Sequence, residues 1–574
     1  MATTSGINTS MFTVDSNGKL NVGGIASGIN SKAIIDALMQ ARRQPAVQLE
    51  AKVTTNSAKI SALGDFKTQM NSVVTSLDKL RASPGSSTNV FNTKSVTGTT
   101  TALSGTASDI DSLVIATVGT DAQNMTHTIK VRQLATAHQV RSDAFTSSTT
   151  ALADLGVTPG TMNIGGKDIT ISSSDTLMDM RSKINNSGAG VTATIVSSDA
   201  STHYLVLTSN KTGAANAMTF GGDTNLTDGL GLTENAGADI KTELSEARNA
   251  IIDVDGIEGI ERASNSIDDV LAGVTLSLLK AEPGTTITLK VEPNLGAIKT
   301  AIFDFVEAYN AVRDFATAER TASDRNDDGT VGSNEVGAMA YDQLLRDALS
   351  QLSTLVATSV DGAPDGFASL GQMGIVLGAD YKLSIDDTIL DNKLLTNVDG
   401  VKNLFAFSST VSDSRVTVLQ RGTSSSTGDY VLNITGTDAS GNVTGASWNG
   451  QAMTVSGKTL TAPDGTTIFF NGGPNLGAVN GIDVGMSRGV ADQFYDYFSE
   501  LTKTGVGSID TQVMQLQTQN TDYKDRVTLL DDRLTIARTN LEAKYAAMEV
   551  ALARLQTLQQ TIESYAESLN GSSS

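Results

Sequence analysis

The feature that most constrains this chain is an uninterrupted seven-residue repeat of apolar side chains near its C-terminus. The repeat occupies seven successive heptad positions: Val527, Leu534, Leu541, Met548, Leu555, Ile562 and Leu569. A second seam begins at Leu530, meets Lys544 and resumes in a shifted register at Tyr545. A strict heptad repeat predicts a long helix packed on another helix, because an isolated helix would leave the stripe in water. That partner is either a helix of the same domain or one from a neighbouring subunit.

A second apolar stripe lies near the opposite end of the chain. Its members are spaced three, four or seven residues apart, as on one face of a helix: Val53, Ile60, Leu63, Phe66, Met70, Val73, Leu77 and Leu80. Ser83-Pro84-Gly85 follows, and proline and glycine end helices. Two stripes at opposite ends favour terminal helices that pair with each other or with neighbouring subunits.

Short alternating runs between these ends predict half-buried antiparallel strands. The runs are Ile129 and Val131; Val191, Ala193 and Ile195; Leu205 and Leu207; Ile252 and Val254; Val274, Leu276 and Leu278; and Ile287, Leu289 and Val291. One short helix carrying Leu177, Met180 and Ile184 interrupts them, with Asp175 as its expected N-cap and Gly188 near its end.

Helix is predicted again over residues 297–312 and around residues 345–352, followed by a second β insert at about residues 423–484. Asn449-Gly450 and Pro463-Asp464-Gly465 are its turn signals. The order is therefore helix, β, helix, β, helix. We expect an α+β multidomain fold, in which a helical coiled-coil stalk from both termini carries nested antiparallel β domains.

Charge and composition exclude several classes of function. Asp and Glu number 62 against 41 Lys and Arg, so the net charge is −21, which repels nucleic acid and disfavours an anionic membrane surface. No stretch reaches the roughly 18 apolar residues that would span a membrane. The chain has no cysteine, which excludes disulfides and thiolate chemistry. The N-terminus shows no basic head and apolar run, so no cleaved secretory signal is expected.

One catalytic motif occurs, Gly485-Met486-Ser487-Arg488-Gly489, which matches the G-x-S-x-G nucleophile elbow. The three histidines, His127, His138 and His203, all precede Ser487, whereas the hydrolase order needs a histidine after the serine. A serine without its base is not activated, so we interpret the motif as a turn and expect no enzyme. The histidines lack metal-ligand spacing, and the glycines of residues 23–28 lack the context of a nucleotide site.

A twelve-residue acidic loop fits the pattern D-x-[DN]-x-[DN]-G-x5-E at every constrained position. The candidate Ca²⁺ ligands are Asp324, Asn326, Asp328, the carbonyl of Thr330 and a bidentate Glu335. Gly337 weakens the exiting helix and no second copy pairs with the loop, so a solvated acidic loop is the alternative. Any Ca²⁺ is expected to be structural, and no cofactor is required.

Several stretches of the chain resemble one known family, and three of them illustrate the resemblance. Residues 24–45 (GIASGINSKAIIDALMQARRQP), 127–142 (HTIKVRQLATAHQVRS) and 161–198, which include the Ile184-Asn185 pair, are similar to flagellar filament cap proteins, also called hook-associated protein 2. In that family, the first stretch is a short apolar helix ending near the proline. The third resembles a β-helix-β module shared with flagellins, and Asn30 stands where many members carry Asp.

The resemblance implies an extracellular protein at the filament tip, exported unfolded by the flagellar type III apparatus. It implies a homo-oligomeric ring, usually a pentamer, with flagellin, hook–filament junction proteins and an export chaperone as partners, and with neither nucleic acid nor membrane bound. Such a cap promotes the folding and insertion of arriving flagellin. The alternative is a secreted adhesin-like β-domain surface protein, and in some relatives the cap also serves adhesion.

Combined with the patterns above, the resemblance predicts the following domains, since 574 residues are too many for one core. They are an N-terminal export and terminal-helix region, 1–40; a helical leg domain, 41–85, 297–420 and 490–530; a β domain, 86–140 and 240–296; an inserted β domain with the flagellin-type module, 141–239; a second β insert, 421–489; and a C-terminal coiled-coil helix, 531–574. The role of the second insert is left open.

Overall fold

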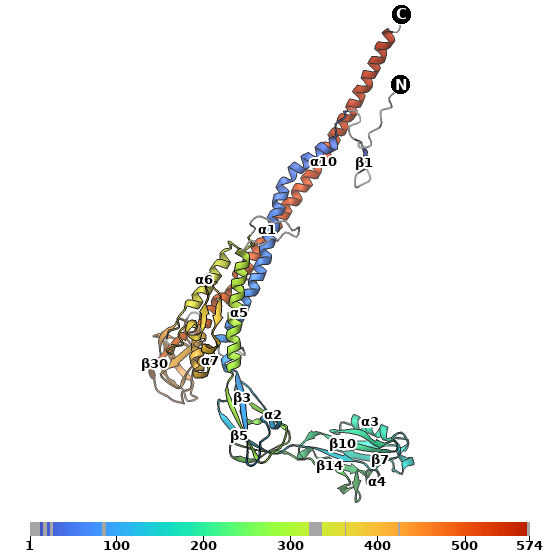
Figure 1. The fold of residues 1–574 in the computed structure, drawn as a ribbon, viewed down its shortest axis with the longest axis vertical. Helices are drawn as coiled ribbons and strands as arrows, with labels where there is room; N and C mark the ends of the chain where they lie inside the picture. The colour runs from blue at the N-terminus through green and yellow to red at the C-terminus, as the bar shows by residue number, and fades with distance from the viewer. Residues whose placement is uncertain are drawn as a thin grey trace. The chain divides into compact units, whose positions relative to one another are not determined.

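The computed structural model describes residues 12–14, 20–22, 27–82, 88–320, 336–361, 363–422 and 425–570 (Figure 1). The chain forms two compact units. One unit comprises Met1–Gly85, Ala301–Lys393 and Asp399–Ser574, and the other comprises Ser86–Thr300 and Leu394–Val398. Helices and many antiparallel sheets together make an α+β multidomain protein, as the alternation of periods predicted.

The first unit is built on two long helices, α1 (Ser31–Leu80) and α10 (Ser508–Asn570), which lie side by side (Figure 1). The other helices are α5 (Leu295–Arg320), α6 (Gln343–Ala357), α7 (Asp387–Thr396), α8 (Val398–Phe405) and α9 (Val490–Thr502). The predicted stripe of α1 supplies buried Leu63, Phe66 and Met70, and Phe66 stacks on Phe315 of α5 at 5.8 Å between ring centroids. The unit also contains two hairpins, β1–β2 (Phe12–Val14 and Leu20–Val22) and β20–β21 (Ile375–Leu377 and Leu383–Ile385).

Two helix boundaries differ from those expected. The prediction of a short helix that ends near Pro45 is wrong, because α1 continues through Pro45 to Leu80. Pro45 lies on the exposed side of α1, where water can bond the carbonyl that a proline leaves free. The boundary expected between residues 530 and 531 is also wrong, since α10 passes through it without a break.

The second unit contains two hydrophobic cores. The first lies between the sheets β16-β15-β5-β19-β3 and β17-β18-β4 and includes Ile129, Ile252 and Leu289. Its elements are β3 (Lys94–Ala102), α2 (Ile110–Leu113), β4 (Val114–Val118), β5 (Thr126–Gln133), β15 (Ala250–Val254), β16 (Ile257–Arg262), β17 (Ser266–Leu271), β18 (Val274–Leu278) and β19 (Thr285–Pro293). Alternate side chains of these strands enter the core, as their period of two predicted.

The second core of this unit includes Leu177, Met180 and Ile184 of α3, packed with side chains from the sheets β14-β6-β10-β9 and β11-β7-β8. Its elements are β6 (Ala137–Arg141), β7 (Gly160–Ile164), β8 (Lys167–Ile171), α3 (Leu177–Asn186), β9 (Val191–Asp199), β10 (Thr202–Thr212), β11 (Phe220–Gly222), α4 (Thr224–Gly229), β12 (Thr233–Glu234), β13 (Asp239–Ile240) and β14 (Glu243–Ser245). Asp175 is not the N-cap of α3. Thr176 caps it in a capping box with Asp179.

The second β insert is part of the first compact unit, together with the long helices. It forms the sheets β22-β30-β24-β25-β26 and β23-β29-β28-β27. Its strands are β22 (Phe407–Val411), β23 (Val416–Gln420), β24 (Gly428–Thr437), β25 (Val443–Trp448), β26 (Gln451–Ala452), β27 (Thr454–Ser456), β28 (Thr459–Thr461), β29 (Thr467–Phe470) and β30 (Val479–Arg488). The predicted Asn449-Gly450 turn is confirmed, with both residues at positive φ between paired Trp448 and Gln451.

Two further expectations for this insert are wrong. It begins at Phe407 rather than residue 421, because β22 and β23 pair within its sheets and Phe407 and Val416 lie in its core. Ser487 is not in a turn, since it pairs with Ser408 inside the β30–β22 ladder. Within the part of the chain that the structure describes, no helix is both long and apolar enough to cross a membrane.

Candidate assembly surface

Charged and polar contacts fix α1 and α10 in an antiparallel register. Arg43 of α1 bonds Asp531 of α10, with Nε 3.0 Å from Oδ1, and Lys67 bonds Asp510 at 2.6 Å. Arg538 also pairs with Asp36. From pair to pair, the residue number rises along α1 while it falls along α10, so the two helices run antiparallel. Ion pairs therefore join α1 and α10 along most of the length of α1.

The predicted heptad positions of α10 fall into two groups. Val527, Leu534, Leu541 and Met548 are half-buried, and α1 is the long helix beside them. Leu555 and Ile562 are exposed. The side chain of Leu569 lies outside the described residues. The heptad repeat of α10 therefore extends beyond the part of α10 that pairs with α1, because α1 begins at Ser31.

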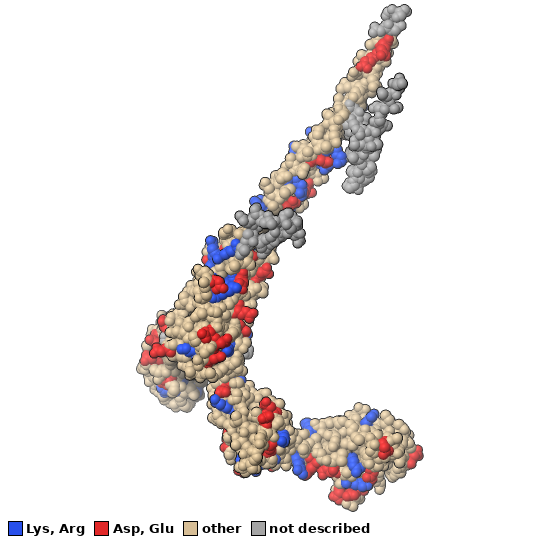
Figure 2. All heavy atoms as spheres, viewed as in Figure 1, with Lys and Arg blue, Asp and Glu red and all other residues tan. Residues whose placement is uncertain are grey.

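A run of exposed apolar side chains marks the last turns of α10. Leu555, Leu558, Ile562 and Tyr565 are spaced three, four and three residues apart and are 60 to 69% exposed. We call these four residues the C-terminal stripe. Figure 2 shows this end of α10 as a surface with few charged atoms apart from an acidic group near the tip. Spacing of this kind is that of a coiled-coil seam, so the stripe has the form of a helix-binding face.

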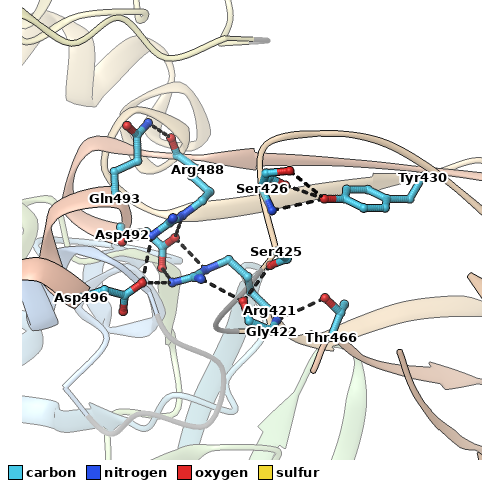
Figure 3. A network of polar contacts seen from close by, with 10 residues as sticks. All are labelled: Arg421, Gly422, Ser425, Ser426, Tyr430, Thr466, Arg488, Asp492, Gln493 and Asp496. Carbon is cyan, nitrogen blue, oxygen red and sulfur yellow. Dashed lines mark hydrogen bonds and ion pairs between the residues drawn. The ribbon is translucent and has the colours of Figure 1, made fainter. Parts of the chain in front are cut away.

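A buried charge network joins the second β insert to α9 (Figure 3). Arg421 lies 2.9 Å from Asp492 and 2.8 Å from Asp496, and Arg488 lies 2.7 Å from Asp492 and 3.1 Å from Asp496. The side chains of Arg421 and Asp492 are only 9% and 7% exposed. Burial lowers the pKa of Arg421, but the two carboxylates outweigh it and raise that pKa overall. The guanidinium therefore stays charged, and the insert is held to α9 by Arg421, after β23, and by Arg488, at the end of β30.

Sequence patterns missed this network for a simple reason. Arg488 and Asp492 are four residues apart, a spacing that signals a helical ion pair, although Arg488 itself ends a strand. Arg421 is 71 residues from Asp492, and no local pattern connects them. Only the closure of the insert's sheets brings the two together.

The remaining candidate sites are placed as follows. The proposed Ca²⁺ ligands at residues 324–335 lie outside the described residues. Among the residues that are described, no group of His, Asp and Glu is arranged to hold a metal ion. Ser487 donates its hydroxyl hydrogen to the backbone carbonyl of Asp361 at 2.7 Å. His138 is buried, where Nδ1 accepts the Met218 N–H and Nε2 lies 2.9 Å from Glu243.

Three family models match the chain. The model described as flagellar hook-associated protein 2 C-terminus matches residues 247–557, its N-terminal counterpart matches residues 27–138, and the flagellin hook IN motif matches residues 160–211. The chain is 30% identical over 387 residues to flagellar hook-associated protein 2 of Escherichia coli K12. The matched region covers 66% of this chain and 78% of that protein. The B-type protein of Pseudomonas aeruginosa PAO1 is 30% identical over 62% of this chain and 74% of its own length.

Solved structures of the same name are also similar. The D1-D2-D3 domains of the Escherichia coli flagellar cap protein FliD match with 27% identity and a TM-score of 0.44, over 60% of this chain and 89% of that one. FliD (HAP2) of Pseudomonas aeruginosa PAO1 matches with 30% identity and a TM-score of 0.31, over 39% of this chain and all of that one.

All three family models describe parts of flagellar proteins, and together they define this α+β chain with its paired terminal helices as a flagellar component. One of them alone matches more than half of the chain. The chain belongs to the flagellar hook-associated protein 2 family.

Proposed function

We propose that this protein caps the distal end of the flagellar filament and promotes the folding and insertion of exported flagellin. The observation that carries the proposal is the C-terminal stripe, a coiled-coil face that extends beyond the helix it is paired with. A stripe of this kind is stabilised when it packs against another helix and leaves water. The matched relatives, named as flagellar hook-associated proteins and caps, support this role and give no support to the adhesin alternative.

In this proposal, α1 and α10 form a coiled-coil stalk that carries the nested β domains. The stripe of α10 packs against helices of flagellin at the filament tip. Four exposed side chains make a modest contact, which suits a leg that must detach and dock again as the filament grows. The β domains would form the plate beneath which flagellin folds.

The assembly is proposed to be a homo-oligomeric ring, and the resemblance described above implies a pentamer. Export through the flagellar type III apparatus, an export chaperone, and contact with hook–filament junction proteins belong to the same proposal. Each of these rests on family resemblance rather than on a contact within this chain.

The test is to place charges on the stripe. Leu555→Asp combined with Ile562→Asp should leave the fold unchanged but abolish filament growth, so that flagellin leaks into the medium. The matched control is Ala553→Asp combined with Gln560→Asp, because at 100° per residue these positions lie on the opposite face of the same turns. Filament length by electron microscopy and secreted flagellin by immunoblot are the measurements. Normal filaments in the stripe variant would reject the proposal.

A further inference from the structure

Strand β9 forms one edge of the sheet β14-β6-β10-β9. It pairs with β10 from Val191 to Asp199, and no strand of the described chain lies on its other side. The outward N–H and C=O groups of an edge strand are a ready template for another strand. The edge of β9 therefore needs something that stops strand addition.

Asn185, on the last turn of α3, bonds the backbone of this edge at one residue. Its Oδ1 accepts the Ala193 N–H at 2.7 Å, and its Nδ2 donates to the Ala193 carbonyl at 3.0 Å. A primary amide carries an acceptor and a donor side by side, as a peptide group does. One side chain thus makes both hydrogen bonds that an antiparallel strand would make with Ala193.

The neighbouring residue explains how Asn185 is held there. Ile184 is fully buried in the core of this domain, so its side chain fixes the rotation of α3 about its axis. The capping box of Thr176 and Asp179 fixes the other end of the helix. Burial of Ile184 therefore holds α3 in the orientation that lets the next side chain, Asn185, reach the β9 edge.

We propose that Asn185 blocks strand pairing at the β9 edge, and that the strand it excludes is β9 of a second copy of this chain. Two antiparallel copies of one edge form a self-complementary contact, which is the geometry of a two-fold dimer. In such a pair centred on Val196, the two Val196 residues lie opposite each other, and Ala193 of one copy lies opposite Asp199 of the other.

The first measurement is hydrogen–deuterium exchange at the Ala193 amide of the full-length protein. Asn185→Ala should speed exchange about tenfold, because the amide loses its acceptor and becomes exposed to water. Asn186→Ala is the control, since Asn186 is also exposed but makes no hydrogen bond to β9 in the described structure. An unchanged Ala193 rate in the Asn185 variant would overturn the proposal.

The second measurement detects β9–β9 contact directly. The chain has no cysteine, so Val196→Cys introduces a single reporter thiol. Under mild oxidation, V196C with N185A should form disulfide-linked dimers several-fold more than V196C alone or V196C with N186A. Equal cross-linking in all three would contradict the proposal. If N185A fails to fold, Asn185→Ser, which is too short to reach Ala193, carries both measurements.

Discussion

The ammonium of Lys59 lies 2.7 Å from the carboxylate of Asp342, and the Asp342 side chain is almost completely buried. Asp342 is also the N-cap of α6, where it accepts the Leu344 N–H at 2.8 Å, and it accepts a hydrogen bond from Gln512 of α10 at 2.9 Å. One carboxylate therefore connects α1, α6 and α10. Burial raises its pKa, but the bonds from Lys59 and Gln512 outweigh burial and hold that pKa below its usual value.

We expect Asp342→Asn to lower the free energy of unfolding by about 2 kcal/mol, because it leaves the Lys59 charge without its partner in a mostly buried site. Urea denaturation followed by circular dichroism at pH 7 measures the change. Asp65→Asn, on the exposed face of α1, is the matched control and should change stability by less than about 0.5 kcal/mol. Equal effects of the two variants would show that the contact does not stabilise the helices.

The same contact predicts a pH dependence. Because the folded-state pKa of Asp342 lies below the ordinary aspartate value of 3.8, its stabilising contribution is fully present above that value. The contribution is lost as the pH falls through the folded pKa. The stability difference between wild type and D342N should therefore be constant from pH 5 to 7 and shrink below about pH 4. Urea titrations at pH 7, 5 and 3 test this, and a difference that grows in acid would contradict it.

The network at the base of the second insert predicts a loss of stability when its buried cation is removed. Arg421→Met keeps most of the side-chain volume but leaves Asp492 with Arg488 as its remaining cationic partner. We expect a loss of about 2 kcal/mol. Arg415→Met is the control, because the ion pair between Arg415 and nearby Asp413 is more exposed, with side chains that are 37% and 17% exposed. Thermal unfolding of the two variants should separate them, and identical midpoints would show that the network is not what holds the insert.

The acidic loop at residues 324–335 gives a prediction from sequence alone. If Asp328 is a Ca²⁺ ligand, calcium should raise the melting temperature of the parent protein, and Asp328→Ala should abolish that rise. Asp327→Ala is the matched control, because it removes the same charge from a position of the motif that supplies no ligand. Differential scanning calorimetry with calcium and with a chelator measures both. A parent protein that does not respond to calcium would refute the site.

Sequence patterns predicted those elements whose signal is local. The period of seven in α10 and the period of two in strands such as β19 follow from helix and strand geometry within one segment. Strands β22 (FSSTV) and β23 (VTVLQ) are only five residues long, too short for their alternation to be recognised, so the start of the second insert was misplaced. The N-cap of α3 was missed by one residue, because Asp175 and Thr176 are both good caps and only the capping box with Asp179 decides between them.

Contacts between distant segments could not be predicted in this way. Nothing near Lys59 or Arg421 indicates which carboxylate each will meet, since the partners are set by how whole elements pack. The heptad repeat likewise predicted that α10 needs a helical partner, but not where α1 would stop covering it. That limit depends on the start of α1 at Ser31, which the glycine-rich stretch before it only suggests.

Helix α10 runs for 63 residues without a break. At 1.5 Å per residue, it is a rod roughly 95 Å long. Its first turn is anchored by Ile509, which is fully buried. Because no break interrupts the helix, a force applied to its last turns is transmitted along the helix axis to Ile509. Helix α10 can therefore act as a rigid strut.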